Sequence, residues 1–133
     1  MRTNAREAAF KILFSTQFND EPEYTKRLVI GLENLDENDM AYCNGIVNCV
    51  NENKEKLTKI IDGHSRQFPE SRIFPADRAV LLIATAEILF FDDIPSAVSV
   101  NEAANIASKY SSEKSATFIS GILSEIIREN DGV

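Results

Sequence analysis

The sequence predicts an all-α protein, and three observations support this prediction. Every long segment repeats its apolar residues with the 3.6-residue period of a helix, and no run of strict alternation indicates a sheet. The 133 residues fit one domain of ordinary size, whose folding would bury about two thirds of the surface exposed by the unfolded chain. The composition, 44% hydrophobic and 26% charged, is typical of a globular protein rather than a disordered one.

Three helices are expected in the N-terminal half, about residues 1–63. The first covers residues 3–18 and has a wide apolar face. The second, over 22–32, begins with a proline, which suits the first position of a helix. The third covers 36–63, and Gly63 is its expected C-cap. Its buried side is predicted to carry Cys43, Ile46, Val47, Val50, Leu57 and Ile61.

Three more helices are expected in the C-terminal half, about residues 75–130. The segment that joins the halves contains prolines and little periodicity, so we place the boundary there and expect one short turn of helix in it. The helices cover roughly 76–91, 95–110 and 112–129, and the first is apolar nearly all round and therefore central. The six helices should form two packed bundles within one domain, 1–133.

The last two helices each show an apolar stripe. Small residues on the fifth helix would allow a close approach to its neighbours, and the sixth helix is cleanly amphipathic. The expected inward residues are Ala97, Val100, Ala104 and Ala107 on the fifth helix, and Phe118, Ile119, Ile122, Leu123, Ile126 and Ile127 on the sixth.

The sequence does not indicate a membrane protein or a secreted one. The most apolar stretch, 79–91, is well short of the roughly 20 residues that span a bilayer. The N-terminus lacks the pattern of a signal or transit peptide, so a cytoplasmic location is expected. Cys43 and Cys49 lie about 240° apart around one helix, too far to form a disulfide, which suits a reducing compartment.

Catalysis is not expected, and neither is a metal or another cofactor. The single histidine, His64, has no ligand partner at metal-site spacing, and no phosphate-cradling glycine loop or nucleophile turn occurs. The net charge of −7 and the pI near 4.7 also argue against a general nucleic-acid binder whose whole surface attracts phosphate. A local basic patch or a basic protein partner stays possible for such a chain.

A polar pair, Asn101–Glu102, stands out because it lies among alanines and valines two turns into a helix, too late to cap it. Positions 98, 101 and 105 form a face distinct from the alanine stripe. Glu87 could approach Glu102 across two helices, where a salt bridge or hydrogen bond is favoured over a catalytic or metal site. Spacing alone favours a structural role for the pair over a functional one.

Two basic spots are candidates for contact with phosphate groups or bases. Near the N-terminus, residues 1–18 contain three cations, Arg2, Arg6 and Lys11, and a single anion, Glu7, so this segment is locally positive. The two arginines are four residues apart and share a helix face. Beside a helix N-terminus such a pair could contact phosphates, although an ordinary solvated start is an equally good interpretation. The second spot is the stretch KYSSEKSATF, where lysines and aromatic rings surround a serine-rich helix start. Such rings more often belong to a hydrophobic core than stack on bases.

Three blocks of sequence resemble the NusB family of bacterial transcription antitermination factors over essentially the full chain. The first is NAREAAFKILF at 4–14, and the second is DRAVLLIATAEILFFDDIPSAVSVNEAANIASKY at 77–110. The third, FISGIL at 118–123, is similar to Phe-Val-Asn-Gly-Val-Leu in the family. Together, the Asp-Arg start of the second block and its 94–104 segment are specific.

The resemblance implies a two-bundle all-α fold that binds boxA-type RNA together with NusE, a small-subunit ribosomal protein. The protein would support ribosomal RNA transcription as part of the transcription elongation complex, without catalysis, and a homodimer is possible. The implied RNA-binding residues are Arg2, Arg6, Tyr110, Lys114, Phe118 and Ser120. The implied partner-binding residues are Asp77, Glu87, Asn101 and Glu102.

The chain departs from the family pattern at the RNA surface. It has Arg2-Thr3-Asn4 where relatives often carry two adjacent arginines, so its attraction for phosphate should be weaker and less dependent on salt. Ser120 stands where an Asn is usual, which removes an amide donor. Lys114 stands where an acidic residue is common, and it could return some of the lost attraction.

Two other functions are kept open. The chain could be a helical protein-binding or self-associating module that has lost RNA binding, which the charge of −7 and the thinned arginine cluster would fit. It could also resemble the RNA-binding domain attached to RNA cytosine methyltransferases, although 133 residues leave no room for a methyl-transfer domain.

Overall fold

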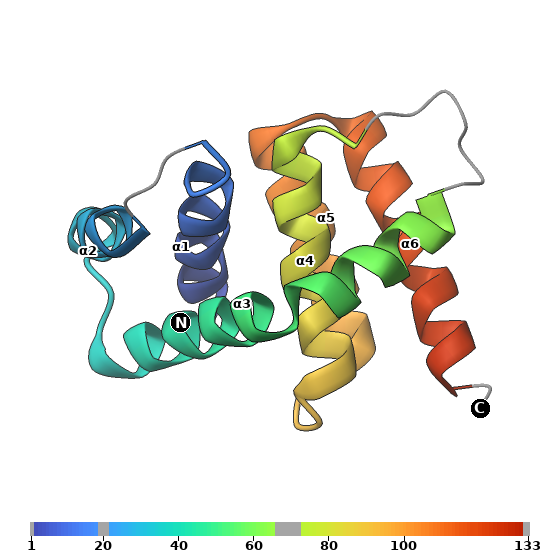
Figure 1. Ribbon diagram of the computed structural model, residues 1–133, viewed down its shortest axis with the longest axis horizontal. Coiled ribbons are helices and arrows are strands. Elements are labelled where there is room, and N and C mark those ends of the chain that lie inside the picture. Colours follow the sequence, from blue (N-terminus) through green and yellow to red (C-terminus); the bar gives the residue numbers. More distant parts are fainter. Residues whose placement is uncertain (1, 19–21, 66–72, 132–133) are drawn as a thin grey trace.

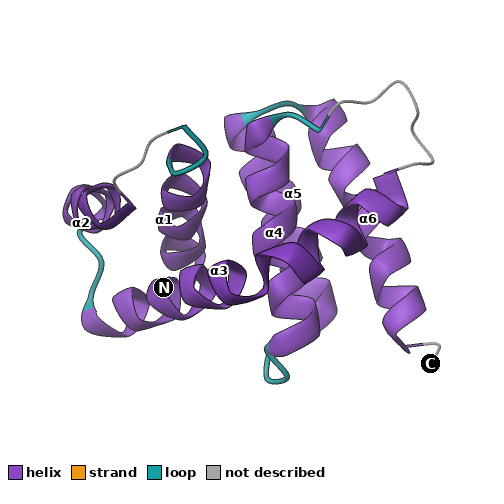
Figure 2. Cartoon of the chain, viewed as in Figure 1, coloured by secondary structure: helices purple, strands orange, loops and turns teal. Residues whose placement is uncertain are grey.

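The protein is all-α, as predicted. The computed structural model describes residues 2–18, 22–65 and 73–131, and in this part of the chain Figure 2 shows helices and loops but no strand. The helices are α1 (Arg2–Ser15), α2 (Pro22–Glu33), α3 (Glu37–Ser65), α4 (Pro75–Phe90), α5 (Ser96–Tyr110) and α6 (Glu113–Asp131).

The helices form two bundles that share α3 (Figure 1). In the first bundle, α1 packs against α2 and α3. In the second, α4, α5 and α6 pack against one another. With 29 residues, α3 would be about 44 Å long if straight, and it contacts α1, α4 and α6, so it crosses from one bundle to the other. One hydrophobic core cluster includes residues from both bundles.

The α4 helix lies at the centre because it is apolar on nearly every side, as expected from the sequence. All residues from Ala79 to Glu87 are buried, and the helix packs against α1, α3, α5 and α6. Two polar side chains, Thr85 and Glu87, are buried with the aliphatic ones. A helix covered on so many sides holds its polar side chains at fixed positions, which sets the geometry around Glu87.

The α3 helix changes direction at Asn53, whose backbone is not helical (φ −117°, ψ 15°). The Asn53 side-chain amide donates a hydrogen bond to the carbonyl oxygen of Cys49 at 2.8 Å. In a straight helix this carbonyl would accept from the backbone N–H of residue 53, so the side chain replaces part of the bonding that the kink weakens. The predicted inward residues of α3 are buried on both sides of the kink.

Helix ends differ from the expected bounds. The α1 helix ends at Ser15, because residues 16–18 tighten into a turn in which the N–H groups of Gln17 and Phe18 bond to carbonyls three residues back. Gly63 was expected to end α3, but the helix continues to Ser65 and brings His64 between two carboxylates of α6. The helical turn expected between α3 and α4 falls largely on 66–72, outside the described residues.

The inner face of α5 is rotated by one residue from the expected alanine stripe. Ala107 is buried as predicted, but the other buried residues are Ser99, Ala103 and Ile106, whereas Ala97 is exposed and Val100 and Ala104 are half-buried. Ile106 is the largest aliphatic side chain in this stretch, and its burial outweighs the close approach that the alanines alone would favour. On α6, Ile119, Ile122, Leu123 and Ile126 are buried as predicted, whereas Phe118 and Ile127, also expected to face inward, are half-buried.

Replacing Leu123 with Ala should lower the free energy of unfolding by about 2–5 kcal/mol, because it leaves a cavity where α6 enters the core. Ser124→Ala, on the exposed side of the same turn, should change it by less than about 0.5 kcal/mol. Urea denaturation followed by circular dichroism measures both. Equal losses for the two variants would contradict the packing described for α6.

Raising the pH should destabilise the protein through Cys43. Burial raises the pKa of this fully buried thiol to about 11, above that of an unfolded cysteine. The folded state therefore keeps a proton that the unfolded state loses, and the stabilisation is complete below about pH 9 and is lost as the pH rises through about 11. The free energy of unfolding should fall by roughly 3 kcal/mol over this pH range, because each unit of pKa difference between the folded and unfolded states corresponds to about 1.4 kcal/mol.

Cys43→Ala should show a flatter fall of unfolding free energy between pH 8.5 and 11 than the parent protein does, whatever its stability at neutral pH. Chemical denaturation at several pH values measures this slope. Parallel pH profiles for the two proteins would show that Cys43 does not titrate in this way.

Candidate functional site

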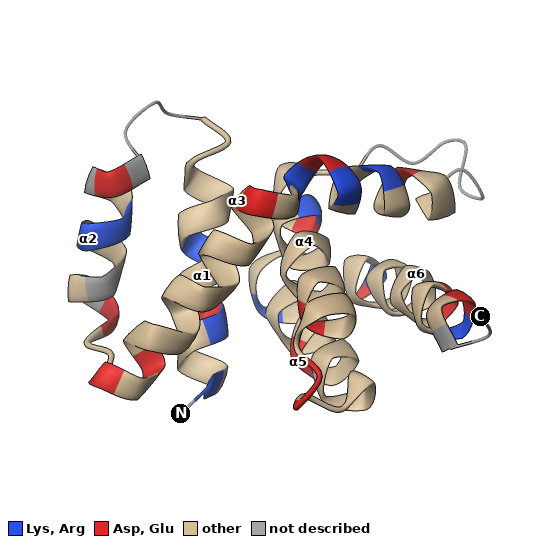
Figure 3. Ribbon diagram, turned by 60° about the horizontal axis from the view of Figure 1, so that its bottom comes forward, with Lys and Arg blue, Asp and Glu red and all other residues tan. Residues whose placement is uncertain are grey.

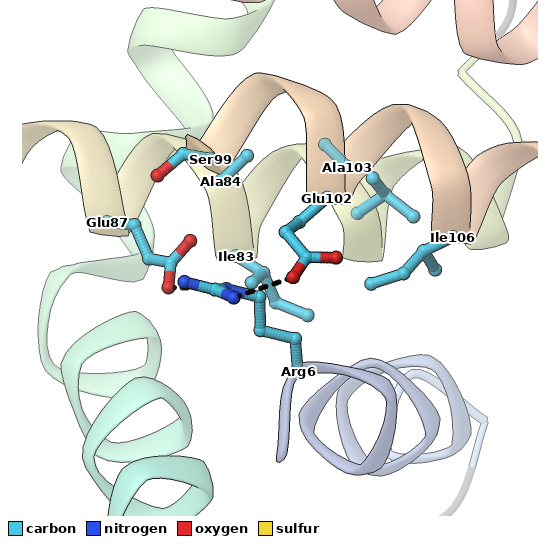
Figure 4. Close-up of a pocket in the computed structure, with 9 residues that line it drawn as sticks. Arg6, Ile83, Ala84, Glu87, Ser99, Glu102, Ala103 and Ile106 are labelled. Carbon is cyan, nitrogen blue, oxygen red and sulfur yellow. Dashed lines mark hydrogen bonds and ion pairs between the residues drawn. The ribbon is translucent and has the colours of Figure 1, made fainter. Parts of the chain in front are cut away.

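A buried ion-pair network joins α1 to the second bundle. The Arg6 side chain is 3% exposed, and its guanidinium lies between Glu87 of α4 and Glu102 of α5 (Figure 4). Arg6 Nε is 2.8 Å from Glu87 Oε2, and Arg6 Nη1 is 3.0 Å from Glu102 Oε1. A single cation from the first bundle therefore binds carboxylates of two helices in the second.

Two hydroxyl groups complete this network. The phenol of Tyr42, on α3, donates to Glu87 Oε2 and lies 3.4 Å from Arg6 Nη2. Thr3 Oγ1, one turn before Arg6, donates to Glu102 Oε1 at 2.7 Å. Four helices thus meet through five side chains, to which we refer as the Arg6 network.

The Arg6 network holds one cation between two carboxylates, of which Glu87 is the more deeply buried. Burial acts to lower the pKa of Arg6, but the Glu87 carboxylate beside it more than compensates, and the pKa is raised. Burial, together with the hydrogen bond to Glu87, raises the pKa of Tyr42 as well. At neutral pH the network therefore contains a cationic arginine and a protonated phenol.

The Arg6 network leaves little room for a ligand. Beside it lies a cavity of ≈ 10 Å³, lined by Arg6, Glu87, Ser99 and Glu102 among others, which is at most enough to hold one water molecule. Glu87 Oε1 and Ser99 Oγ are buried there without a hydrogen-bond partner in the described structure. Because Arg6 occupies the space between the carboxylates, a catalytic use of Glu87 and Glu102 is disfavoured. No group of metal-ligating residues occurs among the described residues.

This arrangement differs from the surface positions that the sequence suggested for Arg6 and Glu87. We expected Arg6 to face RNA and Glu87 to face a protein partner, but both side chains are buried and bind each other. Arg6 and Arg2 do lie near one another on α1, yet only Arg2 is exposed, at 52%. The approach of Glu87 to Glu102 was foreseen, whereas Tyr42 and Thr3 were missed. The one sequence signal that could have identified Tyr42 is its position, an aromatic hydroxyl on the edge of the apolar stripe of α3.

The outer face of α5 carries exposed residues without charge. Val98, Asn101 and Asn105 share this face, as expected, and each is exposed, whereas Glu102 turns toward the Arg6 network. The loop before α5 is acidic, with Asp92 and Asp93 exposed (Figure 3). Asn101 and Glu102 therefore have different surroundings: Asn101 faces outward and Glu102 faces inward.

Four helix ends meet at the opposite end of α1, at the top of Figure 1. The Gln17 side-chain amide, just after α1, donates to the carbonyl oxygen of Pro75, the first residue of α4, at 3.0 Å. Ser115 Oγ, in the first turn of α6, donates to Asp77 Oδ2 of α4 at 2.9 Å. The C-terminal end of α5 joins them through the Tyr110 ring, whose centroid is 5.1 Å from that of Phe10. We call this region the four-helix end.

Tyr110 is a half-buried platform flanked by cations. The ammonium groups of Lys11 and Lys109 lie 5.6 and 5.3 Å from the centre of its ring. Lys109 also binds Glu7 at 2.7 Å, and this hydrogen bond raises the pKa of Lys109. Lys114, exposed in the first turns of α6, has no ion pair within the described part of the chain.

The remaining predicted residues at the four-helix end are more buried. Phe118 and Ser120 are half-buried on α6. Asp77 was expected to accept a cation from a protein partner, but it is 3% exposed and accepts the hydrogen bond from Ser115 Oγ. Its other oxygen, Oδ1, has no partner in the described structure. Ser112 Oγ accepts from the backbone N–H of Ser115 at 3.0 Å and thereby caps α6.

The sequence and the fold are similar to those of known proteins. The NusB family model matches residues 3–128. The transcription antitermination protein NusB of Clostridium novyi (strain NT) is 39% identical over 131 residues, 96% of this chain and 98% of the relative. The protein of the same name from Natranaerobius thermophilus is 36% identical over 132 residues, 96% of this chain and 95% of the relative.

This chain belongs to the NusB family. The solved structure of T. maritima NusB has a TM-score of 0.85 and 32% identity, over 97% of this chain and 92% of that one. A crystal structure of the antitermination factors NusB and NusE in complex with dsRNA has a TM-score of 0.86 and 23% identity, over 96% of both chains. The two-bundle architecture is thus the NusB fold.

Removing the cation of the Arg6 network should destabilise the protein strongly. Arg6→Ala should lower the free energy of unfolding by about 3–5 kcal/mol, because the Glu87 carboxylate would stay buried without its counter-charge. Arg2→Ala removes an exposed ion pair and should cost less than about 1 kcal/mol. Chemical denaturation at pH 7 measures both.

Arg6→Ala combined with Glu87→Gln should recover part of that loss, since a neutral amide needs no counter-charge. The cation would prove unimportant for the fold if Arg6→Ala cost no more than Arg2→Ala.

Proposed function

We propose that this protein is a transcription antitermination factor that binds boxA-type RNA together with the ribosomal protein NusE and thereby supports ribosomal RNA transcription. The observation that carries the proposal is similarity over nearly the whole chain to proteins named transcription antitermination protein NusB, at 36–39% identity. A complex of NusB, NusE and dsRNA on the same fold gives further support for both partners.

The RNA surface in this proposal is the four-helix end. Tyr110, Lys114, Phe118 and Ser120 belong to it, and Lys11 and Lys109 flank the Tyr110 ring. Aromatic rings can stack on bases, lysines attract phosphates, and the N-termini of α4 and α6 add donors and positive partial charge. Arg2 lies at the other end of α1, about 20 Å away along the helix axis, where an extended strand could reach it.

Arg6 has a different part in this proposal from the one its sequence pattern suggested. A phosphate could bind Arg6 only by displacing Glu87 or Glu102, and the displaced carboxylate would repel it. We assign Arg6 the role of positioning α1 against α4 and α5, so that the Phe10 ring stacks on the Tyr110 ring.

The protein-binding surface in this proposal is the outer face of α5. It presents Asn101 without neighbouring charges, and the acidic loop with Asp92 and Asp93 borders it. An uncharged centre with a charged rim is typical of a protein interface. Because ribosomal proteins are basic, the acidic rim and the net charge of −7 would speed the encounter. Glu87, Glu102 and Asp77 support this surface and the RNA surface from within the protein.

The protein would act in the cytoplasm, within the transcription elongation complex, as a binding component rather than an enzyme. Among the described residues no helix is long and apolar enough to cross a membrane. Self-association into a homodimer through the uncharged face of α5 would compete with NusE for the same surface.

A second candidate is a protein-binding module without RNA affinity. It is favoured by the net charge of −7 and by Arg6, whose cation is engaged inside the protein and leaves Arg2 as the exposed arginine of α1. The two candidates differ in whether the chain binds RNA.

A gel-shift titration of a boxA-like RNA, with and without NusE and at two salt concentrations, separates them. We expect weak binding by the protein alone and much tighter binding with NusE. Lys114→Ala should weaken binding and reduce the salt slope by about one, as expected for one lost phosphate contact. Lys54→Ala, an exposed lysine on α3, is the matched control and should bind like the parent protein.

Formation of the NusE complex without RNA binding in any condition would establish the second candidate. Equal effects of Lys114→Ala and Lys54→Ala would move the RNA surface away from the four-helix end.

A further inference from the structure

We propose that Phe18 and Phe74 extend the RNA surface of the four-helix end by stacking on unpaired bases. The inference rests on the proposed function and adds two residues and a mode of recognition to it. Among the described residues, these two rings are the most exposed large hydrophobic side chains, at 65% and 63%. Burying either ring would contribute about 1.5–3 kcal/mol to folding, so their exposure calls for another explanation.

Phe18 ends a row of four rings. Its ring meets that of Phe14 edge-on, with centroids 5.3 Å apart, and Phe14 stacks on Phe10 at 5.9 Å. Phe10 in turn stacks on Tyr110 at 5.1 Å. The row therefore runs from the proposed RNA-binding residue Tyr110, along α1, to a ring in solvent. The turn after α1 holds it there, because the Phe18 N–H donates to the carbonyl of Ser15 at 3.0 Å.

Phe74 occupies the N-cap position of α4 in an extended conformation (φ −64°, ψ 151°). This position is normally taken by a side chain that can accept a hydrogen bond, and phenylalanine provides none. The residue lies near the end of α1, since the hydrogen bond from Gln17 to Pro75 joins the residues adjacent to Phe18 and Phe74. Phe18 and Phe74 thus belong to the same end of the molecule, where the end of α1 and the start of α4 are joined by this hydrogen bond. Figure 1 shows these two helix ends at the top.

The surroundings favour a nucleic acid strand over an apolar protein segment. Lys11 and Lys109 are paired with Glu33 and Glu7, whereas the exposed Lys114 has no ion pair within the described part of the chain. Two carboxylates lie in the same first turns, Glu113 beside Lys114 on α6 and Asp77 on α4. Exposed rings beside an unpaired lysine match the alternating bases and phosphates of a single strand. A purely apolar partner would gain nothing from these charges.

Stacking makes a prediction that distinguishes these rings from the lysines. A base stacked on an aromatic ring releases no counterions, so the ring should contribute equally at low and high salt, whereas Lys114 should contribute to the salt slope. The contribution should also depend on the ring rather than on apolarity, and it should be absent for duplex RNA, whose bases are already stacked.

The test uses the full-length protein with NusE and a single-stranded boxA-like RNA. Phe18→Leu and Phe74→Leu should each weaken binding about 5- to 100-fold, with an unchanged salt slope. Phe18→Tyr and Phe74→Tyr keep the ring and should bind like the parent protein. Phe90→Leu, a partly exposed ring at the end of α4, is a matched control without effect.

Each outcome has a distinct meaning. Parent-like binding by both Leu variants, with weakened binding by Lys114→Ala, overturns the inference and leaves the proposed function standing. Absence of RNA binding by the parent protein, with or without NusE, would contradict both the inference and the proposed function. If the Leu variants instead lose affinity for NusE in the absence of RNA, the rings contact protein and the inference is wrong. A loss confined to single-stranded RNA and restored by Tyr supports it.

Discussion

The pairing of Arg6 with Glu87 and Glu102 is the constraint on which the arrangement of the two bundles depends. The central helix α4 carries a carboxylate that is 1% exposed, and a buried charge of this kind is tolerated only with a counter-charge and hydrogen bonds. The counter-charge comes from α1 and the hydroxyl from α3. The shared helix α3 and the common hydrophobic core join the bundles, and these directional contacts add a fixed position of α1 relative to α4 and α5.

The position of α1 set by this network also sets both candidate binding surfaces. At one end of α1, Thr3 and Arg6 hold Glu102 inward and leave Asn101 on the outer face of α5. At the other end, Phe10 lies under Tyr110 and the turn after α1 is tied to Pro75. A shift of α1 by one helical turn would therefore disturb both surfaces together.

Sequence patterns predicted the helices well because each helix has its own apolar period. The stripe of α3 was found in full, and it stayed correct across the kink at Asn53. The face of α5 was placed one residue away because alanines pack with little penalty on either side, and only the neighbouring helices decide which side is buried. The roles of Arg6 and Glu87 could not be read in this way. They are 81 residues apart, and neither local pattern indicates a partner in another bundle.

The location of Arg6 inside the protein changes how an acidic chain could bind RNA. Electrostatic attraction is weak when the net charge is −7 and α1 offers Arg2 as its exposed arginine. Affinity must then come from contacts that do not depend on net charge, such as rings that stack on bases, and from a second protein that adds its own cations to the same strand. Weak binding alone and tight binding with a basic partner would give the complex selectivity, because RNA lacking either contact would be released. Binding of one RNA strand by two proteins requires that the RNA-binding and protein-binding surfaces keep fixed relative positions. In this protein the aromatic rings of the four-helix end and the outer face of α5 are both fixed relative to α1.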